Sequence, residues 1–359
     1  MSRFNIFSHK GFLTGFFLLL FTCAFAQDEA FWVTAWNMNT PAKVDSVLSV
    51  ARQYGFDKVF LQTRYRGDAL YTPNRKDSTY SNPDSLCYLL WQNKFDPLAY
   101  AIEKVKNDSL NIGIYAWVTT FVATPHDLRK ITPGHVYYTH PEWFLRTRGG
   151  KVSAYNEYEG AFLDPALPQV RDYLIKVFSD IVVNYDLAGI QLDYVRYPDS
   201  IFGWNEYSLA LEDSLENFDF SKWKMQKINS FVNYAYISLK SLKPRMEISV
   251  AVVSDTVKGR HSYSQDWIKW LNNSYIDRVY VMAYNTSNRS FADLIKRLSQ
   301  MNFRDKMTIV VRSWREFRYY HVSKINDKLK ILKKYHFNSV GFYNYSGLIE
   351  NNYLPFIRF

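Results

Sequence analysis

Residues 186–198, with the sequence DLAGIQLDYVRYP, decide the fold. Residues 189–192 form a short apolar run typical of a buried strand, and a polar cluster that begins with Asp193 follows before Pro198 ends strand pairing. In a parallel α/β barrel the carboxyl ends of the strands form the active-site rim. We therefore predict that Asp193 is a catalytic residue. The alternative is an ordinary strand exit closed by an ion pair between Asp193 and Arg196.

The same alternation of short apolar strands and helices runs along the rest of the chain. Seven further strands are predicted at residues 31–37, 58–63, 112–118, 247–253, 276–283, 307–311 and 339–343. Helices are predicted between the strands at residues 41–54, 96–107, 168–184, 223–242, 264–271, 291–301 and 325–335. Eight strands that alternate with helices predict a (β/α)8 TIM barrel. The lack of a glycine-rich phosphate loop after the first strand argues against a dinucleotide-binding sheet.

The connections after the second, third and fourth predicted strands are long. Every loop that follows a strand lies on the same face of a barrel, so we expect these three loops to wall one cleft. Long loops inside a compact domain are usually functional or mobile. The sequence thus predicts a site at this face.

Residues 1–26 have the organisation of a signal peptide. Two basic residues precede an apolar run at residues 11–21, and residues 24–26 (AFA) supply a cleavage site with small residues. We expect export and a mature barrel domain of residues 27–359. A retained membrane anchor is the alternative, although the apolar run is shorter than the roughly 20 residues that a bilayer span needs.

A lipid anchor at Cys23 is another alternative for the N-terminus, because residues 20–23 loosely resemble a lipoprotein cleavage box. Thr22 is, however, a poor residue directly before that cysteine. Either route predicts a location in the periplasm or at the cell surface. Cleavage after residue 26 leaves Cys87 as the only cysteine, so no internal disulfide is expected and stability must come from a packed core.

The composition limits the classes of partner. The chain has 359 residues, of which 47% are hydrophobic, enough for one large domain. Its formal charge is +10, and the basic residues are spread along the chain, which favours an anionic envelope or polymer over nucleic acid. Aromatic residues make up 18% of the sequence, and several follow predicted strands, where they can stack on sugar rings. We predict a glycan partner and a monomeric protein.

Polar and aromatic side chains gather where the predicted strands end. Amides and arginines can bind sugar hydroxyl or acetamido groups, and aromatic rings can stack on sugar faces. The predicted substrate-binding residues are Arg64, Arg66, Trp117, Arg196, Tyr284, Asn285, Trp314 and Asn344. We also expect Arg196 and Arg64 to keep Asp193 ionised. No HExxH, CxxC or tight His/Asp cluster supports a metal site, no nucleophile elbow is found, and no cofactor is predicted.

Seven stretches of the sequence match a known family in their order and spacing. They are FDKVFLQTRYRGDALY (56–71), FDPLAYAIEKVKNDSLNIGIYAWV (95–118), HPEWFL (140–145), LDPALPQVRDYL (163–174), AGIQLDYVRYP (188–198), DWIKWLNNSYIDRVYVMAYN (266–285) and GFYNYSGL (341–348). The chain resembles the bacterial glycosyl-hydrolase-like family 10, whose members are exported barrel proteins and often lipoproteins. The resemblance implies hydrolysis of envelope or other complex glycans, peptidoglycan-type strands among them. Asp193 matches the acid of the family's strand-four motif.

A second resemblance is partial. Residues 281–284 (VMAY) look like the strand-six segment of family 18 chitinases. Those enzymes carry a glutamate two residues after the position of Asp193, where this chain has Val195. Chitinase catalysis is therefore not predicted.

A glycosidase needs a second carboxyl group that faces Asp193. Asp255 is our first choice, because it follows the fifth strand, which neighbours the fourth in a sequentially wound barrel. The alternative for Asp255 is a cap on the next helix or turn. Glu316 after the seventh strand, and Glu157 or Glu159 in the loop after the third, are further candidates.

The fold alone does not decide between two classes of function. The first is a glycoside hydrolase, and the second is a catalytically inert barrel that binds glycan at the cell envelope. An envelope nuclease or phosphodiesterase, which the positive charge would suit, lacks metal-ligand spacing.

Overall fold

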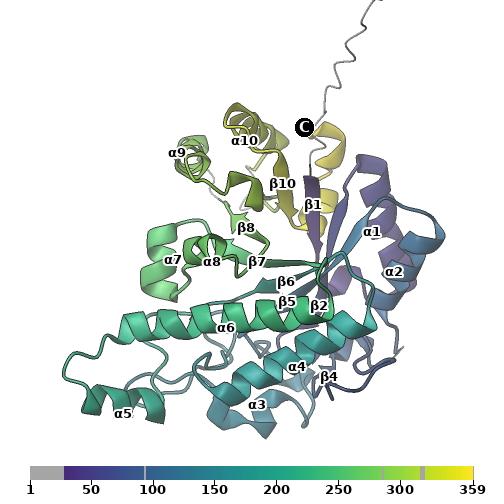
Figure 1. Ribbon diagram of the computed structural model, residues 1–359. Helices are drawn as coiled ribbons and strands as arrows, with labels where there is room; N and C mark the ends of the chain where they lie inside the picture. The colour runs from purple at the N-terminus through teal and green to yellow at the C-terminus, as the bar shows by residue number, and fades with distance from the viewer. Residues whose placement is uncertain (1–27, 93, 285–286, 316–319, 359) are drawn as a thin grey trace, which may run out of the picture.

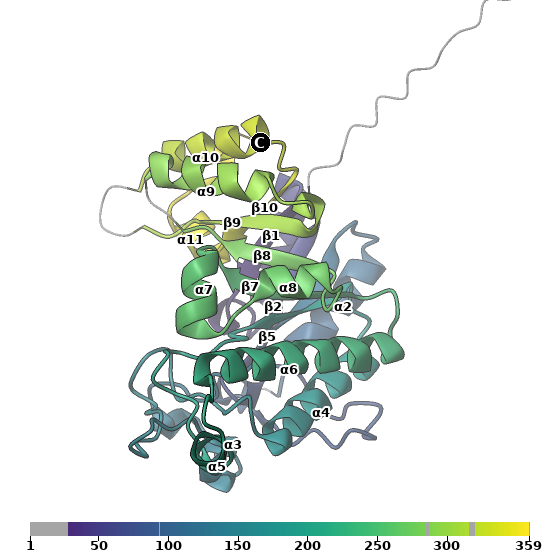
Figure 2. The ribbon, with the colours of Figure 1, turned by 60° about the vertical axis from the view of Figure 1, so that its left-hand side comes forward.

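Eight parallel strands close into a barrel within the described part of the chain (Figures 1 and 2). The computed structural model describes residues 28–358 apart from 93, 285–286 and 316–319. The barrel strands are β1 (Asp28–Val33), β2 (Lys58–Tyr65), β5 (Gly113–Thr119), β6 (Gly189–Asp193), β7 (Glu247–Val253), β8 (Arg278–Met282), β9 (Met307–Arg312) and β10 (Ser339–Tyr343). Pairing of β10 with β1 closes the ring, and the predicted barrel is confirmed.

Helices cover the outside of the barrel (Figure 1). They include α1 (Pro41–Tyr54), α2 (Pro97–Asn107), α4 (Pro168–Asn184), α6 (Phe220–Leu242), α8 (Trp267–Asn272), α9 (Asn288–Ser299) and α10 (Val322–Lys334). Several begin at a side-chain cap, as Thr40 does for α1 and Asp96 for α2, each followed by a proline that favours a first helical turn. Their apolar sides pack on the strands in one large core. No helix in the described residues is long and apolar enough to cross a membrane.

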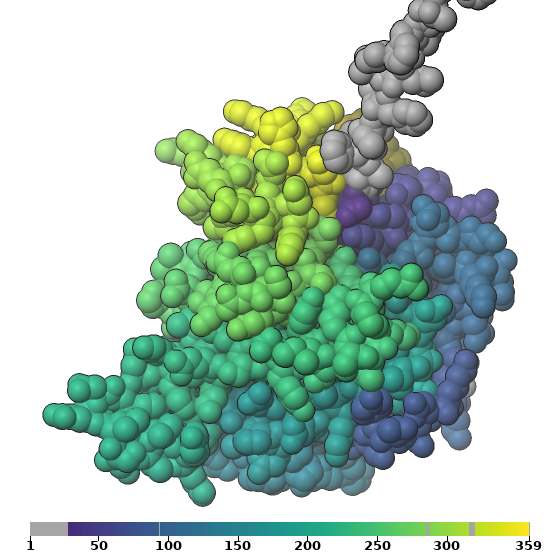
Figure 3. Space-filling model, viewed as in Figure 1, coloured from purple at the N-terminus to yellow at the C-terminus, as the bar shows by residue number. Residues whose placement is uncertain are grey.

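The loops after β2, β5 and β6 are long, as predicted, and contain short elements of their own. These and the other short elements are β3 (Asp68–Ala69), β4 (Ser85–Leu86), α3 (Val136–Thr139), α5 (Glu206–Ser214), α7 (Thr256–Tyr263), α11 (Tyr345–Glu350) and 3-10 turns at Ala35–Asn37, Tyr88–Leu90, Leu128–Lys130, Pro141–Trp143, Arg304–Lys306 and Leu354–Phe356. The α5 segment projects from the side of the molecule (Figure 3). A bridge between Thr147 and Phe202 joins the loop after β5 to the loop after β6.

A layer of mainly aromatic side chains fills the barrel. Its members are Ala30, Trp32, Phe60, Tyr115, Trp117, Tyr280 and Val310. Trp32 stacks on Phe60 with 4.6 Å between the ring centroids. Gly341 makes room for this indole, because a Cβ atom there would lie 2.6 Å from the Trp32 ring. This layer is separate from the larger core between strands and helices, and it closes the barrel below the rim.

An irregularity in β2 changes the direction of its last residues. Gln62 pairs with Trp117, but Arg64 pairs with Val118, so β2 advances by two residues while β5 advances by one. Because side chains alternate along a strand, the extra residue turns Arg64 to the same side as Val118. Val118 belongs to the core outside the barrel. Arg64 therefore points away from the barrel interior.

Candidate active site

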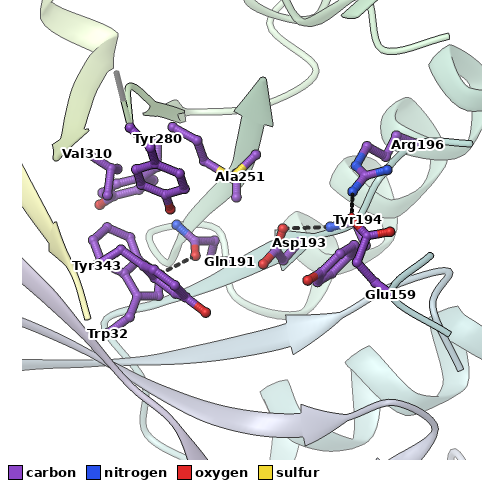
Figure 4. A pocket seen from close by; sticks show the side chains of 12 residues that line it. Trp32, Glu159, Gln191, Asp193, Tyr194, Arg196, Ala251, Tyr280, Val310 and Tyr343 are labelled. Carbon is purple, nitrogen blue, oxygen red and sulfur yellow. Dashed lines mark hydrogen bonds and ion pairs between the residues drawn. The ribbon is translucent and has the colours of Figure 1, made fainter. Parts of the chain in front are cut away.

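A cavity of about 210 Å³ lies at the carboxyl end of the barrel strands. Among the described residues it is lined by Trp32, Glu159, Gln191, Asp193, Tyr194, Arg196, Ala251, Tyr280, Met282, Tyr284, Val310 and Tyr343. Figure 4 shows Asp193 and Glu159 on one side of Gln191, with the rings of Trp32, Tyr280 and Tyr343 on the other. The cavity thus combines carboxyl groups with aromatic walls.

Asp193 is held by one N–H donor on each carboxylate oxygen. Trp117 Nε1 donates to Oδ2 at 3.0 Å, and the backbone N of Tyr194 donates to Oδ1 at 2.7 Å. Tyr194 has a φ of 55°, a left-handed conformation that is unfavourable for a large residue and that is found preferentially at functional sites. The carboxyl group of Asp193 is therefore fixed in one orientation at the end of β6.

Burial raises the pKa of Asp193 above its ordinary value. The two hydrogen bonds and the charge of Arg196 act in the opposite direction, while the negative charge of Glu159 adds to the rise. The sequence led us to expect that arginines keep Asp193 ionised, but burial outweighs Arg196. A carboxyl group with a raised pKa is suited to donate a proton.

Glu159 supplies the second carboxyl group of the cavity. It lies on the loop after β5, and Arg196 Nη2 donates to its Oε1 at 2.7 Å in an ion pair. The Arg196 guanidinium lies over the rings of Tyr263 and Tyr194, at 5.0 and 5.3 Å from their centroids. These contacts restrict Arg196 and with it Glu159. One of the alternatives to Asp255 is thus the acid that the structure brings to Asp193.

Asp255 caps α7 and does not line the cavity. Its Oδ1 accepts hydrogen bonds from the backbone N of Val257 at 3.0 Å and of Lys258 at 2.9 Å. The side chain is exposed. The structure therefore does not place Asp255 beside Asp193, because the start of α7 holds its carboxylate outside the cavity.

Of the two remaining candidates for the second acid, the structure describes only Glu157. Glu157 forms an ion pair with Lys151 at 2.8 Å. It is not among the cavity-lining residues, although it is only two residues from Glu159. Glu316 lies outside the described residues.

Arg64 is sealed outside the barrel. Its Nε donates to Asp84 Oδ2 at 2.6 Å, and its Nη2 donates to the Tyr173 hydroxyl of α4 at 2.9 Å. The Arg64 and Asp84 side chains are both 0% exposed. The prediction that Arg64 contacts substrate and keeps Asp193 ionised is corrected by this placement, and the bulge in β2 is the reason.

Four of the predicted substrate-binding residues lie in or next to the cavity. Arg196 and Tyr284 line it. Trp117 holds Asp193, as described above, and its ring packs edge-on against Tyr343 with 5.8 Å between centroids. Trp314 packs edge-on against Tyr284 at 4.9 Å.

Two other predicted binding residues, Arg66 and Asn344, make contacts outside the cavity. Arg66 donates through Nη1 to the carbonyl of Thr124 at 3.4 Å. Asn344 caps α11, with its Oδ1 accepting from the backbone N of Gly347 at 3.0 Å. Neither residue lines the cavity, and Asn285 lies outside the described residues.

Trp32, Gln191 and Tyr343 line the cavity but were not predicted. Gln191 had a signal: it is a polar residue in an apolar run, two positions before Asp193, and residues two apart on a strand share a face. Trp32 was missed because the first strand was predicted to continue to residue 37. The strand ends at Val33.

The described residues contain no cluster of side chains that could hold a metal ion. No three His, Cys, Asp or Glu side chains come close enough there to hold a metal ion.

Comparison with known proteins finds similar sequences and folds. The model of the glycosyl hydrolase-like 10 family matches residues 29–336. Glycosyl hydrolase YngK of Bacillus subtilis (strain 168) is 25% identical over 263 residues, which cover 66% of this chain and 48% of the relative. Glycosyl hydrolase DigH of Escherichia coli (strain K12) is 23% identical over 274 residues, covering 67% and 57%. This chain therefore spans about half the length of the curated relatives it matches.

Among solved structures, the PgaB (BpsB) glycoside hydrolase domain from Bordetella bronchiseptica is similar with a TM-score of 0.66. The sequences are 13% identical, and the match covers 92% of this chain and 97% of that domain. At this identity the likeness shows the barrel fold. Both curated relatives are named glycosyl hydrolases. The match over residues 29–336 shows that the chain belongs to the glycosyl hydrolase-like 10 family.

Proposed function

We propose that the protein is an exported glycoside hydrolase that cleaves a complex or cell-envelope glycan, such as peptidoglycan-type strands, by carboxylate acid/base catalysis. The observation that carries the proposal is that Asp193 and Glu159 line the same cavity at the barrel rim. Most glycoside hydrolases use a pair of carboxyl groups that flank the scissile bond. Asp193 and Glu159 form such a pair.

Asp193 is the general acid in this mechanism. Its raised pKa keeps a proton available for the oxygen of the leaving sugar. Once the proton has been transferred, the carboxylate accepts from Trp117 Nε1 and from the backbone N of Tyr194, and both donors stabilise the negative charge. The same contacts therefore orient the acid and favour its product form.

Glu159 acts on the anomeric carbon from its ion pair with Arg196. It either attacks that carbon itself or deprotonates a water molecule, and carboxyl separations of about 5–5.5 Å and about 6.5–9.5 Å distinguish these retaining and inverting routes. The anomeric configuration of the first product, read by NMR during hydrolysis, assigns the route. The rings of Tyr284 and Tyr343, 5.8 Å apart between centroids, supply walls for the sugar.

The signal-peptide pattern of residues 1–26 supports export, and the formal charge of the full chain, +10, falls to +8 when Arg3 and Lys10 are removed, which still suits an anionic envelope polymer. Intact mass measurement of protein recovered from the envelope tests this. A mass that begins at Gln27 supports signal-peptide cleavage, a heavier lipidated species supports anchoring at Cys23, and a full-length cytoplasmic species contradicts export.

The catalytic proposal is tested by release of reducing ends from purified glycan strands. We expect Asp193→Asn and Glu159→Gln to lower turnover by a factor of about 10² to 10⁴ while the unfolding midpoint stays close to wild type. Glu157→Gln is the matched control, because Glu157 is on the same loop but pairs with Lys151. Glycan binding without any reducing ends from the wild type would instead support the inert glycan-binding barrel.

A further inference from the structure

Gln191 is a buried polar residue whose amide orientation is set by one contact. Its Oε1 accepts a hydrogen bond from Trp32 Nε1 at 2.7 Å. An indole N–H can only donate, so it selects the oxygen of the amide and leaves Nε2 directed elsewhere. The hydrogen bond from Trp32 therefore determines which end of the Gln191 amide is the oxygen and which is the nitrogen.

The Nε2 atom of Gln191 is a donor that the protein leaves unused. It has no hydrogen-bond partner among the residues that the structure describes, although it is buried. Unpaired buried donors are uncommon because they carry an uncompensated loss of hydration. Gln191 lines the cavity, and Figure 4 shows its amide nitrogen directed toward Tyr280 and Ala251.

We infer that Gln191 selects the sugar that the cavity accepts, by donating from Nε2 to an uncharged acceptor oxygen on that sugar. The inference rests on the proposed function, because it requires a sugar in the cavity. Gln191 and Asp193 are two residues apart on β6 and face the same side of the strand. The selecting contact therefore lies next to the acid.

The fixed amide distinguishes neutral sugars from cationic ones. Trp32 already donates to Oε1, so the group of Gln191 that still lacks a partner among the described residues is the donor Nε2. A protonated amino group has donors only, so a 2-ammonium sugar would place a donor against the Nε2 donor and leave Nε2 unsatisfied. An acetamido carbonyl or a hydroxyl oxygen would instead satisfy Nε2.

The surroundings of Gln191 fit an uncharged substituent. Ala251 and Val310 line the cavity as small apolar residues and can contact an acetamido methyl group. Both acids already have partners, because Glu159 pairs with Arg196 and Asp193 accepts two N–H donors. The cavity should therefore discriminate against free amines.

The test is binding of three monosaccharides to the inactive Asp193→Asn protein. N-acetylglucosamine, glucose and glucosamine differ at one position, where they carry an acetamido, a hydroxyl and a protonated amino group at pH 6. Titrations followed by indole fluorescence and by the indole N–H signals in NMR give three dissociation constants. We expect the better of the two neutral sugars to bind at least tenfold more tightly than glucosamine.

A second substitution, at Gln191 itself, should shift the binding preference from the neutral sugars toward glucosamine. Gln191→Glu keeps the size of the side chain, leaves one oxygen for Trp32 and turns the other into an acceptor. In that background we expect glucosamine to gain at least tenfold relative to the neutral sugars. Val310→Thr is the matched control: it adds a hydroxyl group to another cavity-lining residue and leaves the Gln191 side chain unchanged, and it should not reverse the order.

The outcomes separate this inference from the proposed function. Equal binding of the three sugars, or tightest binding of glucosamine before substitution, would overturn the role of Gln191 and leave the glycosidase proposal standing. Binding of none of the sugars, with no hydrolysis by the wild type, would overturn the proposed function. A merely structural role of Gln191 predicts that substitution weakens all three sugars equally, and that result also overturns the inference. Whether N-acetylglucosamine or glucose binds better identifies the acceptor as a carbonyl or a hydroxyl.

Discussion

Two clusters at the rim combine an arginine, an acid and an aromatic ring, but they differ in exposure to the cavity. Asp193 and Arg196 lie in the cavity, where Trp117 donates to the acid. Arg64 and Asp84 are sealed in the core outside the barrel, with no exposed side-chain surface.

The difference shows that side-chain direction, and not residue type, decides which cluster can act on a substrate. Both clusters follow a barrel strand, and both contain an arginine that the sequence alone assigns to substrate. Along β6 the alternation is regular, so Asp193 faces inward. In β2 the bulge between Gln62 and Arg64 reverses the alternation and turns Arg64 outward. The following substitutions test whether the sealed cluster controls stability and the open cluster controls turnover.

The largest effect is expected for the sealed ion pair. Arg64→Met leaves Asp84 buried without its partner, so the free energy of unfolding should fall by about 3–5 kcal/mol. Urea unfolding measures this loss, and hydrolysis per folded molecule should stay at the wild-type level. Arg196→Met is the matched control, with a small effect on unfolding and a large one on hydrolysis. A stable but inactive Arg64→Met protein would contradict the comparison.

The stability of the fold should also depend on pH through Asp68, whose pKa is affected by the charges of Asp84 and Arg64 in the sealed cluster. Burial, with the charge of Asp84 adding and that of Arg64 opposing, raises the pKa of Asp68 to about 8. The protonated form is favoured in the folded state, so its contribution to stability is complete below the ordinary pKa of about 4 and is lost as pH rises to about 8. Asp68→Asn should flatten this decline, by an amount on the order of a few kcal/mol. Urea unfolding at pH 5 and pH 8 measures it, and an unchanged slope would count against the assignment.

An intermediate effect is expected for the donor that holds Asp193. Trp117→Phe removes the indole N–H, a hydrogen bond to a charged group worth about 1.5–3 kcal/mol, so kcat should fall by about 10- to 100-fold. The bond favours the ionised acid, so its loss should raise the pKa of Asp193 further and move the alkaline limb of the pH profile to higher pH. Trp314→Phe is the control, because Trp314 packs on Tyr284. A limb that moves to lower pH would contradict the mechanism.

The smallest effect is expected for Asp255. Asparagine caps a helix about as well as aspartate, so Asp255→Asn should leave both hydrolysis and unfolding close to wild type. Reducing-end release and thermal melting provide the measurements. A hundredfold loss of hydrolysis in the folded variant would instead support the choice of Asp255 as the second acid.

Much of the fold could be predicted because periodicity and strand composition are local properties. Apolar runs identified the eight strands, and helical spacing identified the main helices between them. The predicted end of the first strand was wrong, since residues 35–37 continue the apolar and aromatic pattern but form a 3-10 turn. Short elements such as α5 and α7 lie in polar segments where periodicity is weak.

The site was predictable only where a strand presents it directly. Asp193 follows a regular strand, so its position was readable from the sequence. Glu159 reaches the cavity through a loop whose course depends on pairings such as Phe144 with Leu163, which sequence spacing does not specify. The bulge that redirects Arg64 carries no glycine or other local signal.

The central claim is that Asp193 donates the proton to the leaving sugar. It is tested most directly by comparing wild type and Asp193→Asn on two substrates with the same glycosyl unit, one with a poor sugar leaving group and one with a dinitrophenyl leaving group that needs no protonation. We expect a loss of about 10² to 10⁴ on the first substrate and a far smaller loss on the second. Equal losses on both substrates would show that Asp193 is not the general acid.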